Sequence, residues 1–85
     1  MKRQRERHRR VATHIRSVVA EEASLTISLA PGFDRAAWDE MLDVERECCP
    51  FFRFDVDYEA GRIGVGVAEP RHRPALGALA AALRG

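Results

Sequence analysis

The sequence predicts an α+β fold, a two-layer sandwich in which an antiparallel sheet of three to four strands carries helices on one face. Apolar residues alternate with polar ones in residues 25–29, 52–58 and 63–67, which is the period of half-buried strands. In residues 35–49 and 74–84 apolar residues recur every three or four positions, as in helices packed on one side. A chain of 85 residues has too little interior for two cores, so we expect one domain.

Residues 1–15 are expected to form a basic arm or helix, and residues 16–85 the α+β domain. Six basic residues and one glutamate give residues 1–10 a charge of +5, which leaves −4 for the remainder because the whole chain carries +1. Such an arm suits an acidic protein partner or nucleic acid. No aromatic residue lies among its arginines to stack on bases. A solvated helix face, or contact of the arm with its own domain, is therefore the competing interpretation.

Two strands and a helix start are expected before residue 40. Residues 18–22 are a short strand candidate, and residues 25–29 have the alternation of a half-buried strand. Asp34 is the expected N-cap of the helix that follows, because its side chain can accept from the first free backbone N–H groups. Phe33 and Trp38 flank this cap at the spacing of a hydrophobic staple.

This helix is expected to run from about Arg35 to Cys49, where Pro50 ends it because proline has no N–H to donate. At 100° per residue its apolar side chains occupy one arc. Glu45 breaks the pattern, since it projects from the middle of that arc one turn before the cysteines. A carboxylate there requires a partner, and an arginine or backbone donors near Cys48 are the candidates.

Residues 52–58 and 63–67 are expected to pair as an antiparallel hairpin that turns at Gly61. Two glycines leave one face of the second strand bare, and we expect backbone or a helix to cover that face closely. Pro74 suits the first turn of a last helix. Its apolar stripe consists of Leu76, Leu79, Ala80 and Leu83.

The adjacent thiols of Cys48 and Cys49 are the sharpest chemical feature of the chain. A trans peptide places their Cα atoms about 3.8 Å apart, whereas ordinary disulfides span roughly 4.4–6.8 Å. Reduced thiols are therefore expected, and with them a reducing compartment. The sequence also contains neither an apolar run of membrane-spanning length nor a signal peptide. We thus expect a cytoplasmic protein with no membrane partner.

Glu45 precedes Cys48 and Cys49 by three and four positions, which brings the three side chains together on a helix. Two thiolates and a carboxylate suit Zn(II), while two thiolates alone suit Hg(II), As(III) or Cu(I). Of the histidines, His72 is retained as a fourth ligand. Two chains that met at this helix end would supply four thiolates, which makes a metal-linked homodimer one expected arrangement.

Binding is favoured over catalysis, because thiolate formation is opposed at a helix C-terminus beside Glu45 and Glu47. No phosphate-binding, dinucleotide-binding or metalloprotease motif is present in the sequence. The leading hypothesis is a non-enzymatic thiol module for a soft metal or metalloid ion. The alternatives are a structural or protein-interaction domain whose cysteines pack in the core, and a nucleic-acid binder that uses residues 1–10.

The run from Glu45 to Phe54, ERECCPFFRF, resembles a group of small bacterial proteins with a Glu-x-x-Cys-Cys-Pro-Phe motif. In that group the motif precedes a strand hairpin and a short leucine-rich helix, and the resemblance covers roughly residues 24–84. Members of the group look like accessories of heavy-metal resistance, especially to mercury. The resemblance implies a soft-metal role and singles out Glu45, Cys48, Cys49 and Pro50.

Overall fold

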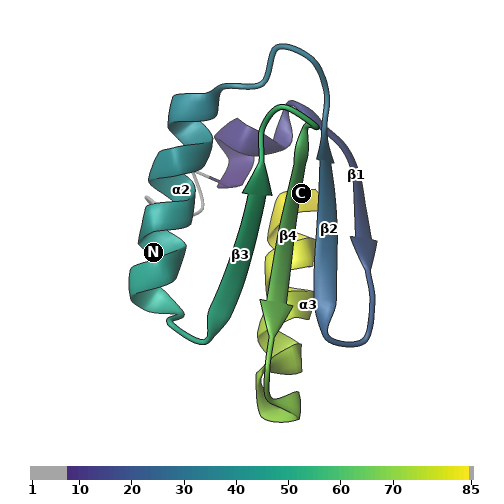
Figure 1. Ribbon diagram of the computed structural model, residues 1–85, viewed down its shortest axis with the longest axis vertical. Coiled ribbons are helices and arrows are strands. Elements are labelled where there is room, and N and C mark those ends of the chain that lie inside the picture. Colours follow the sequence, from purple (N-terminus) through teal and green to yellow (C-terminus); the bar gives the residue numbers. More distant parts are fainter. Residues whose placement is uncertain (1–7, 85) are drawn as a thin grey trace.

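In the computed structural model, which describes residues 8–84, helices cover one face of a four-stranded antiparallel sheet (Figure 1). The strands are β1 (Ile15–Ala20), β2 (Ser24–Leu29), β3 (Phe52–Asp57) and β4 (Arg62–Val67). The helices are α2 (Arg35–Cys48) and α3 (Arg73–Arg84), with a 3-10 turn η1 (Pro70–His72) before α3. Residues 8–12 form a further short helix. The predicted α+β fold is confirmed.

The sheet has the strand order β1-β2-β4-β3, and every neighbouring pair is antiparallel. β2 and β3 therefore run in the same direction, with β4 inserted between them. The α2 helix makes the long connection from β2 to β3 across one face of the sheet. The predicted hairpin of β3 and β4 is present, and Gly61 turns it with a φ of +67°, which glycine adopts without steric cost.

The predicted helix α2 has the expected start and the expected end. Asp34 caps it, because its side chain accepts a hydrogen bond from the backbone N–H of Ala37 at 3.1 Å. Cys49 follows the last helical residue with a non-helical φ of −131°, as the residue before a proline usually does. The helix therefore ends with one thiol on its last turn and the next thiol just beyond it.

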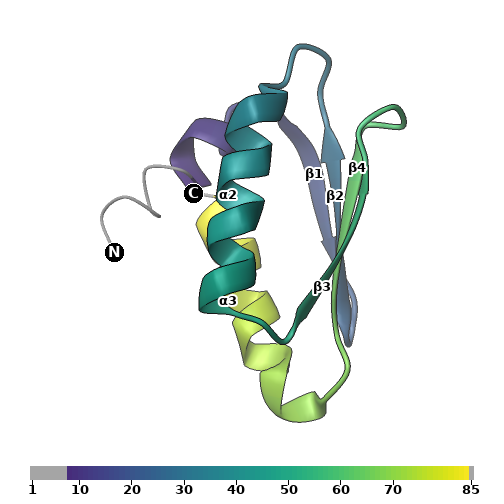
Figure 2. The same cartoon turned by 60° about the vertical axis from the view of Figure 1, so that its left-hand side comes forward.

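The core lies between the sheet and the helices, and Trp38 of α2 is fully buried there. Ile63, Val65 and Val67 point from β4 into this layer, so the glycines between them lie on the opposite face. That face was expected to be closely covered, and this expectation is wrong for the described part of the chain, since both helices lie on the other side (Figure 2). A Cβ on Gly64 would meet its nearest neighbour, Cβ of Asp55, at an ordinary 3.6 Å.

The segment before β1 contributes to the same core. Val11, from the short helix of residues 8–12, is only 2% exposed. Ala30 donates its backbone N–H to the carbonyl of His14 at 2.7 Å, which attaches the end of this segment beside β2. Packing of the chain thus begins before the predicted boundary between residues 15 and 16.

Residues 1–7 hold most of the predicted basic arm and lie outside the described residues, so the partners expected for residues 1–10 stay predictions. No helix within residues 8–84 is long and apolar enough to cross a membrane.

Candidate functional site

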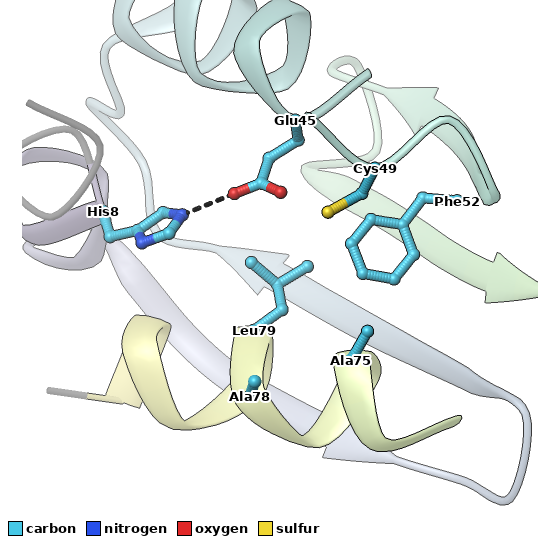
Figure 3. Close-up of a pocket in the computed structure, with 7 residues that line it drawn as sticks. All are labelled: His8, Glu45, Cys49, Phe52, Ala75, Ala78 and Leu79. Carbon is cyan, nitrogen blue, oxygen red and sulfur yellow. Dashed lines mark hydrogen bonds and ion pairs between the residues drawn. The ribbon is translucent and has the colours of Figure 1, made fainter. Parts of the chain in front are cut away.

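Glu45 is buried on the last turn of α2 and forms a hydrogen bond with His8. Its residue exposure is 6%, because it projects from the arc of the helix that faces the core. His8 donates from Nε2 to Oε1 of Glu45 at 2.8 Å, and the His8 side chain is 13% exposed (Figure 3). One partner of this carboxylate is thus a histidine from the segment before β1, and the arginine or local backbone donors expected for it stay predictions.

Cys49 presents its sulfur to the same carboxylate. Its backbone N–H donates to the carbonyl of Glu45 at 2.7 Å, and its side chain points between Glu45 and Phe52 (Figure 3). Burial raises the pKa of the Cys49 thiol, and the negative charges of Glu45 and Cys48 and a hydrogen bond to Glu45 raise that pKa further. The thiol therefore stays protonated at neutral pH.

His8, Glu45 and the thiol of Cys49 form the polar end of a small pocket between α2, the start of β3 and α3. Its volume is about 200 Å³. Away from His8, Glu45 and the thiol, the walls that the described residues form are carbon, because α3 contributes only alanines and a leucine (Figure 3). The lining residues are His8, Glu45, Cys49, Phe52, Ala75, Ala78 and Leu79.

The other predicted ligands lie elsewhere. Cys48 is exposed and does not line the pocket. His72 stacks on the ring of Phe51, with ring centroids 4.1 Å apart. Across residues 8–84, no three His, Cys, Asp or Glu side chains are arranged to hold one metal ion. Of the four predicted ligands, the structure therefore brings Glu45 and Cys49 together, and it does not join Cys48 and His72 to them in one ligand set.

His8 is the site residue that the sequence analysis missed. The signal lies in Val11, which is the first apolar residue after Met1 in a strongly polar segment. On a helix, residues three apart share a face, so an inward Val11 places His8 on the buried side one turn earlier. The anomalous Glu45 and this inward histidine could have been paired on that ground.

The arrangement of Cys49, Glu45 and His8 is suited to moving one proton. A carboxylate that accepts a hydrogen bond from a thiol can take its proton when sulfur forms a new bond, and an imidazole on the other side holds the carboxylate in place. The pocket beside the sulfur offers room for the atom that sulfur would bind.

Comparisons with protein-family models, curated proteins and solved structures find no match for this chain.

Proposed function

We propose that this protein captures a soft metal or metalloid ion through the thiol of Cys49, with the exposed thiol of Cys48 as the site of first encounter. One observation carries the proposal: a half-buried thiol points toward a buried carboxylate beside a small pocket (Figure 3). When the metal–sulfur bond forms, the thiol proton passes to Glu45, so no separate base is required. Soft ions such as Hg(II), As(III) and Cu(I) prefer thiolate donors.

The protonation state of Cys49 favours capture of a cation over nucleophilic catalysis. A thiol with a raised pKa is a weak nucleophile at neutral pH, because the thiolate is the reactive form. A bound cation, in contrast, drives deprotonation of its own ligand. Zinc is disfavoured relative to softer ions, since structural zinc sites use four ligands and the described residues offer no cluster of three.

Cys48 is placed for a first encounter, because it is exposed at the end of α2 and directly precedes the pocket thiol. A soft ion bound there has to move only between neighbouring residues to reach Cys49. The motif at Glu45, Cys48, Cys49 and Pro50 resembles that of a group linked to heavy-metal resistance. The soft-metal role that this resemblance implies agrees with the proposed chemistry.

A structural role is the second candidate, and a specific contact favours it. Cys49 packs against the hydrophobic core, and free cysteine commonly behaves as a small apolar side chain. In this role the pair of His8 and Glu45 fixes the N-terminal segment to α2, and neither thiol meets a ligand.

Titration of the reduced protein separates the two candidates. We expect Hg(II) and arsenite to produce thiolate-to-metal absorbance in the wild type, and Zn(II) to bind more weakly. Cys49→Ser should lower Hg(II) affinity by at least about tenfold, since it removes the thiolate donor that soft ions prefer. Cys48→Ser, the matched control, should retain the pocket thiol and lose less. Equal binding by both variants and the wild type would leave the structural role.

Two further measurements address the homodimer and the arm. If two chains share one ion, light scattering should show a mass doubling at one Hg(II) per two chains, and Cys48→Ser should prevent it. Nucleic-acid binding through residues 1–10 predicts retention on DNA that falls steeply with salt and disappears when the charges of these residues are removed.

A further inference from the structure

We propose that the preferred cargo is an organometal cation, a soft metal ion that already carries one apolar substituent and has one open coordination position. This inference rests on the proposed function and specifies its substrate class. It follows from three properties of the pocket: the number of donors, the carbon walls and the volume.

The donor count comes first. The pocket contains one thiol, that of Cys49, while Cys48 is exposed outside it. A bare Hg(II) ion requires a second sulfur, which the pocket does not supply. A cation of the form R–Hg⁺ requires only one thiolate, because carbon already occupies its other position. A single half-buried thiol therefore matches the organometal cation better than the bare ion.

The walls provide the second property. Around the sulfur, the apolar lining consists of Phe52 together with Ala75, Ala78 and Leu79 on α3 (Figure 3). These side chains carry no polar atom that could replace the hydration shell of a bare ion. They are suited to an apolar substituent, which gains by leaving water. The volume fits as well, since about 200 Å³ exceeds the roughly 150 Å³ of an engineered apolar cavity that binds benzene.

The capture step balances without an oxidant or reductant. The cation arrives as R–Hg–X, where X is chloride or water. Sulfur of Cys49 forms the Hg–S bond as the Hg–X bond breaks, and X departs with its electron pair. The S–H proton passes to the carboxylate of Glu45, which His8 holds at 2.8 Å. The R–Hg bond remains intact, so the product is a bound R–Hg–S adduct.

The test compares phenylmercury, methylmercury and Hg(II) in competition with glutathione, with adducts counted by native mass spectrometry. Glutathione provides a thiol without a pocket, so its own preference between the two organomercurials is the reference. We expect the wild type to exceed that reference preference for phenylmercury by at least about tenfold, the discrimination that a few buried carbons typically give. Cys49→Ser should lose the preference.

Ala78→Leu is the decisive variant, because it adds bulk at the exposed rim of the pocket and leucine is a good helix former. It should abolish the phenyl preference and leave Hg(II) binding unchanged. Ala81→Leu makes the same exchange on an exposed position of α3 outside the lining and should match the wild type.

A wild-type preference equal to that of glutathione, with Hg(II) still bound through the cysteines, would overturn this inference and leave the proposed function standing. A phenyl preference that survives Ala78→Leu would overturn it too. If neither thiol binds any of the three mercurials, both proposals fail together.

Discussion

Replacement of Val11 by alanine should destabilise the protein, because this side chain joins the N-terminal segment to the core. Val11 is 2% exposed, and the change removes two buried methyl groups. At about 0.8 kcal/mol for each buried carbon, with a further contribution from the cavity left behind, the loss is about 2 kcal/mol. An unfolding entropy of about 2.1 cal/mol/K per residue then gives a fall in Tm of about 10 °C for this chain.

The assay is thermal and urea unfolding followed by tryptophan fluorescence. Trp38 is the single tryptophan of the chain and is fully buried, so its emission reports on the core directly. Arg9→Ala is the control, since Arg9 lies in the same short helix and is exposed. It should leave Tm nearly unchanged. If Val11→Ala and Arg9→Ala melt together with the wild type, the segment before β1 does not pack on the core and the reasoning is refuted.

Four further measurements test the local electrostatics and the capping of α2. Glu45→Gln removes a negative charge that raises the pKa of the Cys49 thiol, so alkylation of this thiol at mildly alkaline pH should accelerate. Peptide mapping would measure the rate at Cys49, and an unchanged rate would contradict the contact between Glu45 and Cys49. Tyr58, the single tyrosine, has its pKa raised chiefly by burial and then by its hydrogen bond to Asp39 at 2.6 Å. Its phenolate absorbance should therefore rise at higher pH than in free tyrosine, and Asp39→Asn should reverse part of that shift. Tyr58 ionises at lower pH in the unfolded chain than in the folded protein, so its contribution to stability is intact below pH about 10 and declines above it. Urea midpoints measured across that pH range would show this decline. Asp34→Ala should cost about 1 kcal/mol as a lost N-cap, and an unchanged urea midpoint would show that the cap is without effect.

The strands and α2 could be predicted from sequence because their signals are local. Leu25, Ile27 and Leu29 alternate with polar residues, and each is at most 6% exposed on the buried face of β2. The start of α2 at Asp34 follows from capping chemistry within four residues. In both cases the residues that determine the conformation are neighbours in the chain, so their pattern reveals it.

The strand order and the side of the sheet that the helices cover could not be predicted in this way. The position of β4 between β2 and β3 depends on pairings between segments far apart in the chain, such as Thr26 with Gly64. The glycines at positions 64 and 66 suggested close covering, because bare backbone permits close approach. The helices cover the face with the larger apolar side chains instead, since burial of that face removes more apolar area from water.

The candidate site combines both kinds of information. Glu45 could be recognised as anomalous from the helical pattern alone, because an unpaired carboxylate among apolar neighbours is costly. Its pairing with His8 is harder to predict, since His8 is 37 positions away and the face that it shares with Val11 indicates only that it points inward. Cys49 joins them only because α2 ends one residue before it, so its backbone leaves the helix and its sulfur turns to the pocket.

The identity of the three side chains bears on whether the site is more than structural. Replacement of a buried ion pair by well-packed apolar residues is often neutral or stabilising, so packing alone provides no reason for an acid at position 45 and an imidazole at position 8. The capture step proposed for Cys49 does provide one. In that proposal the acid takes the proton of the thiol, the imidazole holds the acid, and the apolar pocket lies beside the sulfur. The proposed step thereby accounts for each element of the site.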